Sequence, residues 1–187
     1  MNTDDNNADK ALVPGQTITQ RWLKRLRSIS VTIFIITIVG IGVDYYRLES
    51  RDTQTISQAE LHTLVQQLTP AQQAVFEQGK PMLVYVWATW CGVCQLTSGA
   101  VNRLFESDYL ISTIALKSGN TETLKKTMSA KSLTFPFYND SDGLLSHSLA
   151  IKATPTFIIV SHTGNILYYS MGVNTEVGLR AKLALFN

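Results

Sequence analysis

The pattern of apolar and polar positions divides this chain into one long apolar run near its N-terminus and a later series of shorter strands and helices. The long run, "SISVTIFIITIVGIGV" at residues 28–43, carries no charge over its sixteen positions. A helix of that length spans roughly 24 Å, against about 30 Å for the hydrocarbon core of a membrane. Continuing the helix through Tyr46 closes the difference, with Trp22 and the tyrosines as interfacial anchors. The pattern therefore predicts a transmembrane anchor at residues 28–46.

The charges that flank the apolar run predict its orientation. Four basic residues lie between Arg21 and Arg27, and no acidic residue occurs between Lys10 and Asp44. The positive-inside rule then places a tail, residues 1–27, in the cytoplasm and the rest of the chain outside it, which in a bacterium is the periplasm. A cleaved signal peptide is the alternative, but the long and partly acidic segment ahead of the run favours a retained anchor.

After a polar linker at residues 47–56, helical and extended patterns alternate over a predicted domain at residues 57–187. Apolar residues from Leu61 to Leu68 recur at helical spacing, and Thr69 followed by Pro70 is a typical helix start. Two short helices are therefore expected before Gly79.

Both cysteines of the chain lie in the stretch "WATWCGVC", as Cys91 and Cys94. The preceding run "PMLVYVWA", residues 81–88, is rich in β-branched and aromatic residues and predicts a buried strand. Apolar residues from Leu96 to Phe105 recur at helical spacing and predict a helix that begins near Cys91. The two thiols are therefore expected where a strand gives way to the first turn of a helix.

The rest of the chain continues to alternate predicted strands and helices and then ends in a predicted hairpin and a helix. "LISTIALK" predicts a second strand, a helix follows from Asn120 to Lys131, "TFPFYND" is another extended piece, and "GLLSHSLA" is a short helix. "TPTFIIV" and "ILYYSMG" predict a hairpin with its turn at His162–Asn165, before a closing helix from Asn174. The series predicts an α/β fold in which helices flank a central mixed sheet.

Composition and charge narrow the class of function. With 187 residues, 45% of them hydrophobic and 16% charged, the chain can build one packed domain. The net charge is only +2, and no basic run alternates with aromatic residues, so we expect no nucleic-acid partner. Two cysteines are too few for a disulfide scaffold, and nothing in the sequence calls for a cofactor.

The position of the thiols predicts asymmetric redox roles. At a helix N-terminus, the Cys91 thiolate would face free backbone N–H groups and the positive end of the helix dipole, which favour the charged form. Cys94, one turn further on and closer to the helix body, would attack a mixed disulfide formed on Cys91. Gly92 and Val93 add no charge to stabilise the thiolate further, so we expect a reducing pair rather than a strong oxidant.

Three alternatives to a reductase remain open at this stage. A buried, inert pair of cysteines would not require this spacing at a strand-to-helix junction. The two thiolates could hold Cu(I), but His62, His147 and His162 do not lie at ligand spacing from the cysteines, so no dedicated metal site is predicted. A disulfide-donating oxidase would differ from a reductase only in direction.

On "WATWCGVC" and "ATPTFIIV", the domain resembles the thioredoxin superfamily, and specifically its membrane-tethered periplasmic members. Together with "VDYYR" at the end of the apolar run, the motif is most similar to that of the suppressor-for-copper-sensitivity D proteins. The resemblance implies a thioredoxin-like fold in which a cis Pro155 faces the cysteines. It also implies that the backbone of Thr154 pairs with an extended substrate segment and that Trp90 contributes to substrate binding.

The resemblance further implies a single-pass inner-membrane thiol–disulfide oxidoreductase with a cytoplasmic N-terminus. Its substrates would be periplasmic proteins with oxidised cysteines, in copper stress or cytochrome c maturation, and a membrane thiol-electron transporter would donate electrons. One position departs from the family pattern: many thioredoxins have a buried acid six residues before the first cysteine, where this chain has Tyr85. A phenol is a poor base at neutral pH, so the proton acceptor for Cys94 stays open.

Overall fold

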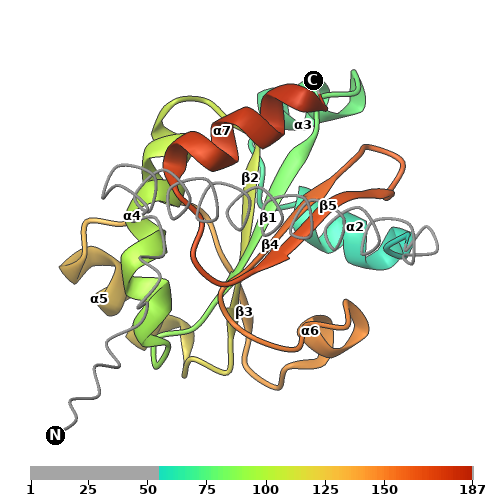
Figure 1. Cartoon of the computed structure of the whole chain (residues 1–187). Helices are drawn as coiled ribbons and strands as arrows, with labels where there is room; N and C mark the ends of the chain where they lie inside the picture. Colours follow the sequence, from blue (N-terminus) through green and yellow to red (C-terminus); the bar gives the residue numbers. More distant parts are fainter. Residues whose placement is uncertain (1–54, 187) are drawn as a thin grey trace, which may run out of the picture. The chain divides into compact units, whose positions relative to one another are not determined.

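A five-stranded mixed sheet organises the protein, as seen in a computed structural model that describes residues 55–186 (Figure 1). The strand order is β3-β2-β1-β4-β5, in which β1, β2 and β3 run parallel to one another and β4 and β5 are antiparallel to their neighbours. The strands are β1 (Met82–Trp87), β2 (Ile111–Leu116), β3 (Tyr138–Asp140), β4 (Thr156–Val160) and β5 (Ile166–Met171). The predicted mixed α/β sheet is thus confirmed for this part of the chain.

Helices cover both faces of the sheet (Figure 1). They are α2 (Gln58–Val65), α3 (Pro70–Glu77), α4 (Gly92–Glu106), α5 (Thr121–Ala130), α6 (Leu144–Ser148) and α7 (Glu176–Leu185). Buried residues of α4, α5 and α7 pack into one hydrophobic core, and those of α2, α3 and α6 pack into a second. Alternate residues of β1 point to the two cores, so the central strand is buried on both faces.

Helix starts follow the local sequence closely. Thr69 caps α3 in a capping box with Gln72, and Pro70 occupies the first helical position, as the sequence predicted. Asn120 likewise caps α5 by accepting from the amide of Thr123. The two short helices and the helix after Asn120 are therefore confirmed.

Two predicted elements are shorter in the structure. In the extended piece "TFPFYND", only Tyr138–Asp140 pairs with β2, because Pro136 and the burial of Phe135 in the core interrupt a ladder. The closing helix begins at Glu176 rather than at Asn174, since Thr175 supplies the side-chain cap. Asn174 instead accepts a hydrogen bond from Lys182 and donates one to Ser170.

The N-terminal end of the described region is fixed to the β4–β5 turn. Thr55 forms an isolated bridge with Asn165, and the amide of Ile56 donates to the carbonyl of Gly164 across 2.9 Å. Gly164 has φ +87°, and a Cβ there would lie 3.0 Å from the Ile56 carbonyl oxygen, so a side chain would be both strained and crowded. This turn lies at the carboxyl end of β4, whereas Pro155 precedes its amino end.

Within residues 55–186, no helix is both long and apolar enough to cross a bilayer. The predicted anchor at residues 28–46, the tail at 1–27 and nearly all of the linker at 47–56 lie outside the described residues.

Candidate functional site

The two cysteines form a disulfide at the start of α4, immediately after β1. Cys91 is the N-cap residue, with extended backbone dihedrals of φ −85° and ψ 106°, and Cys94 lies in the first turn. Their Cα atoms are 5.3 Å apart, within the usual range for a disulfide, so the bond closes without displacing the backbone. The amide N–H of Cys94 donates to Sγ of Cys91 across 3.1 Å. The strand-to-helix position predicted for the thiols is confirmed.

The two cysteines are buried, whereas the side chains next to them in sequence are exposed. Cys91 is 6% exposed and Cys94 only 1%, while the side chains beside them, Trp90 and Val93, are 63% and 42% exposed. Gly92, between the cysteines, is also exposed. Of the two cysteines, Cys91 therefore lies nearer the surface, next to the exposed Gly92, whereas Cys94 is covered by the body of the domain.

The loop that leads into β4 forms the opposite side of the site. The Thr154–Pro155 peptide bond is cis, as expected from the resemblance. The carbonyl oxygen of Thr154 lies 3.5 Å from Sγ of Cys91, so the two segments, 63 residues apart in sequence, meet at this sulfur. The carbonyl of Pro155 accepts from the amide of Gly172, which ties the loop to the end of β5.

Two hydrogen bonds to the end of β2 orient Trp90. Its indole Nε1–H donates to the carbonyl of Lys117 at 3.1 Å, and the preceding amide of Thr89 donates to the hydroxyl of Ser118 at 2.9 Å. The indole ring is thereby held at the surface beside the disulfide. The structure thus brings together Cys91, Cys94, Trp90, Thr154 and Pro155, while their roles stay predictions.

Tyr85 lies directly behind the disulfide and is fully buried. Its hydroxyl group is 3.0 Å from both Thr97 Oγ1 and Ser98 Oγ and 3.4 Å from the carbonyl oxygen of Cys94. Burial raises the pKa of the Tyr85 phenol above its ordinary value of 10.0, although hydrogen bonds with Ser98 and Thr97 act in the opposite direction. The phenol therefore stays protonated at neutral pH and is no acceptor for a thiol proton.

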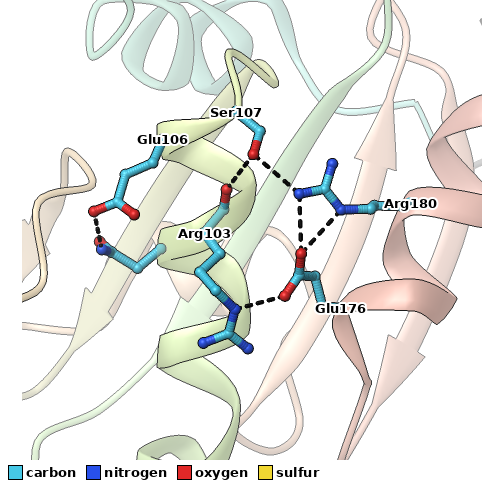
Figure 2. Close-up of polar contacts among 6 residues, drawn as sticks. Arg103, Glu106, Ser107, Glu176 and Arg180 are labelled. Carbon is cyan, nitrogen blue, oxygen red and sulfur yellow. Dashed lines mark hydrogen bonds and ion pairs between the residues drawn. The ribbon is translucent and has the colours of Figure 1, made fainter.

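A charged cluster joins the C-terminal half of α4 to α7 (Figure 2). Glu176 accepts from Arg103 Nε at 2.5 Å and from Arg180 Nε at 3.0 Å. Arg180 also donates to the hydroxyl of Ser107, whose own proton goes to the carbonyl of Arg103. These hydrogen bonds, first that of Arg103 and then that of Arg180, hold the pKa of the Glu176 carboxyl below its ordinary value.

The three histidines are exposed and occur on separate elements, α2, α6 and the β4–β5 turn. His62 and His162 line one small cavity of about 250 Å³ with Phe76 and Glu77, on the face of the sheet away from α4. Among residues 55–186, no three His, Cys, Asp or Glu side chains gather closely enough to hold a metal ion.

Comparisons with known proteins agree with this arrangement. A family model described as Redoxin matches residues 51–183. A "Thioredoxin-like protein" of Haemophilus influenzae is 35% identical over 107 residues, which cover 57% of this chain and 64% of the relative. The "Thiol:disulfide interchange protein DsbE" of Yersinia pestis is 24% identical over 178 residues, 89% of this chain and 95% of the relative. The same-named protein of Pseudomonas fluorescens is 34% identical over 107 residues, 57% of this chain and 60% of the relative. The chain therefore spans less than two thirds of two of these relatives and nearly all of the third.

Solved structures show the same fold. StoA from Bacillus subtilis has a TM-score of 0.51 at 23% identity, covering 55% of this chain and 81% of that chain. The pneumococcal lipoprotein thioredoxin Etrx1 has a TM-score of 0.53 at 17% identity, covering 60% of this chain and 88% of that chain. At these identities the likeness concerns the arrangement of strands and helices, and it supports the predicted thioredoxin-like fold.

Proposed function

This chain belongs to the redoxin family, and we propose that it is a thioredoxin-like thiol–disulfide oxidoreductase that reduces protein disulfides in the bacterial periplasm while tethered to the inner membrane. The observation that carries this proposal is the Cys91–Cys94 disulfide at the start of α4, bordered by the loop of Pro155. The similarity to thioredoxin-like and DsbE proteins agrees with it. The narrower resemblance to suppressor-for-copper-sensitivity D proteins stays a prediction.

In the proposed reaction, Cys91 is the nucleophile. Its thiolate attacks one sulfur of a substrate disulfide, forms a mixed disulfide and releases the other substrate sulfur, which takes up a proton. Cys94 then loses its proton and attacks Sγ of Cys91, which closes the internal disulfide and releases the second substrate sulfur as a thiol. Two electrons and two protons pass to the substrate, so a dithiol donor must reduce the pair again.

The geometry supports these roles because it treats the two sulfurs differently. Cys91, at the N-cap, accepts the Cys94 amide and lies at the free N-terminal end of a fifteen-residue helix. Both features favour a negative charge on its sulfur. Cys94 is covered and can reach only Cys91 without movement of the chain around it.

We propose that substrate segments bind along the loop before β4. There the backbone of Thr154 is next to Sγ of Cys91, so a cysteine-containing strand that pairs with this segment would place its sulfur beside the nucleophile. The exposed indole of Trp90 would cover the opposite side of that segment. Pro155 is buried beneath and would shape the floor of the binding site.

The proposed direction and location rest on the surroundings of the site and on the sequence. No charged residue stands between the cysteines to stabilise the thiolate strongly, which favours a reducing pair.

The anchor proposed at residues 28–46, between a tail at 1–27 and a linker at 47–56, would hold the domain of residues 57–187 close to a membrane thiol-electron transporter. Such tethering raises the effective concentration of the two partners.

A Cu(I)-binding role is the second candidate, because both sulfurs already lie at one place and two thiolates suit this soft ion. It differs from the first in having no turnover. Stoichiometric Cu(I) retention by the reduced protein without reduction of insulin would favour it.

The decisive experiment traps substrates in cells. Cys94→Ala should accumulate mixed disulfides with periplasmic proteins, whereas Cys91→Ala should accumulate none, and the reverse pattern would overturn the assignment of roles. The purified domain should reduce insulin when supplied with a dithiol. A redox potential as high as about −120 mV, the value of the strong periplasmic oxidants, would contradict the proposed direction.

A further inference from the structure

Three hydroxyl groups meet at the carbonyl of Cys94, inside the domain. Tyr85 brings one from the middle of β1, and Thr97 and Ser98 bring the others from the second turn of α4. All three side chains are at most 5% exposed. Ser98 Oγ donates to the Cys94 carbonyl at 2.8 Å, with Thr97 Oγ1 and Tyr85 Oη at 3.3 and 3.4 Å from the same atom.

The hydroxyl protons of this cluster can be arranged in only a few ways. Each hydroxyl has one proton to donate, and the shortest contact assigns that of Ser98 to the Cys94 carbonyl. Tyr85 can then donate to Ser98 Oγ and accept from Thr97, since both lie 3.0 Å from its oxygen. This arrangement satisfies every hydroxyl, and it forms a neutral chain of hydrogen bonds that ends on Cys94.

The first turn of α4 needs such support. Gly92, its first helical residue, has no heavy atom within 4 Å of where a Cβ would stand, and glycine destabilises a helix. Helix ends also fray. Because β1 is the central strand and Tyr85 is stacked on Phe157 with ring centroids 5.1 Å apart, the phenol is a rigid point from which to hold this turn.

We propose that Tyr85, Thr97 and Ser98 are positioning residues for the resolving thiol. They hold the carbonyl side of Cys94 while its amide binds Sγ of Cys91, and so keep Cys94 oriented for attack on the mixed disulfide. The cluster acts on the second chemical step and contributes no ionising group. This inference rests on the proposed two-step reduction and deepens it.

A positional role predicts an effect on one step only. Removing a hydroxyl leaves Cys91 at the N-cap with its own donors, so the first attack should be unchanged. Resolution by Cys94 should slow by about two- to tenfold, the factor that corresponds to one lost hydrogen bond. A purely structural role would slow both steps or neither.

The experiment uses Ser98→Ala, which removes a single buried oxygen, together with Tyr85→Phe. Each pre-reduced variant is mixed with a peptide disulfide whose two halves differ in mass, then quenched in acid and analysed for mixed disulfide and released thiols over time. Ser98→Thr keeps the hydroxyl and should restore the rate of resolution. Thr113→Val is the matched control, because this buried hydroxyl binds Trp87 and Pro136 instead of Cys94.

The outcomes separate this inference from the proposed function. The inference is supported if the mixed disulfide forms at the normal rate in Ser98→Ala and Tyr85→Phe but lasts longer than in the wild-type protein. Thr113→Val should show normal rates for both steps. Variants that resolve as fast as the wild-type protein would overturn it. If Tyr85→Phe does not fold, Ser98→Ala decides alone. A wild-type protein that never forms the mixed disulfide would instead overturn the proposed function.

Discussion

The Cys94 amide and Cys91 Sγ are joined by a hydrogen bond of 3.1 Å, so the covered cysteine stabilises its partner even before it attacks it. In the first turn of α4, Cys94 thus donates a hydrogen bond to Sγ of Cys91 through its backbone amide, and its own sulfur bonds to that same atom in the disulfide.

Trp90→Ala should reduce kcat/KM for a protein disulfide about ten- to thirtyfold, because exposed tryptophans beside a binding site carry a large share of contact energy. Stability should change little, since the lost hydrogen bond to Lys117 is at the surface. Insulin reduction and urea unfolding measure the two effects. Leu144→Ala, a similarly exposed side chain on α6, is the control, and an equal loss of activity there would contradict a specific role for the indole.

Glu176→Gln should remove part of the acid sensitivity of the domain. In the folded protein, the hydrogen bonds of Arg103 and then of Arg180 lower the pKa of this carboxyl. The unfolded chain therefore binds the proton more tightly, so the stabilisation is complete above the unfolded pKa of about 4.3 and is lost as the pH falls through the folded pKa. Urea midpoints between pH 7 and pH 3 should decline less steeply in the variant. Parallel curves would show that the cluster in Figure 2 does not stabilise the fold.

Asn102→Ala should destabilise the domain by about 2–3 kcal/mol, since it leaves the amide of the buried Phe135 and the part-buried amide of Thr134 without their acceptor. The side-chain oxygen of Asn102 accepts from the amides of Thr134 and Phe135, and its nitrogen donates to Glu106. This residue ties the loop before β3 to α4. Denaturant unfolding measures the loss, which Asn165→Ala at the exposed turn should not reproduce. A change of less than about 0.5 kcal/mol would mean that the loop repacks.

Leu179→Ala should cost about 2–5 kcal/mol, because its side chain is fully buried in the core between α7 and the sheet. Leu185→Ala, in the same helix but 79% exposed, should change stability by less than about 0.5 kcal/mol. Thermal unfolding of both variants tests whether α7 is packed as described. Equal losses of stability in the two variants would contradict the described packing, in which Leu179 faces the sheet and Leu185 faces solvent.

The sequence was sufficient where local rules decide structure. The strand before the cysteines, the Thr69 cap and the Asn120 cap each depend on neighbouring residues, and each is present in the structure. The cysteine pair could be placed for the same reason, since one strand and one helix define its position. The fold class followed from the order of these elements.

The parts that the sequence could not predict depend on residues that are distant along the chain. Tyr85 was recognised as an unusual residue, but its partners are on the far side of a strand-to-helix turn, and only packing brings Thr97 and Ser98 to its hydroxyl. Asn102 carries no sequence signal for its contacts with a loop about thirty residues later. The extent of β3 was overestimated because burial of Phe135 competes with strand pairing.

The entry of the chain beside Gly164 has a consequence for access to the sulfurs. The five residues of β4 separate that turn from Pro155, a strand length of about 17 Å. Thr55 therefore lies at the carboxyl end of β4, whereas the cysteines and Pro155 lie at its amino end. A substrate that approaches Cys91 therefore meets the domain away from Thr55 and Ile56, the first residues that the structure describes.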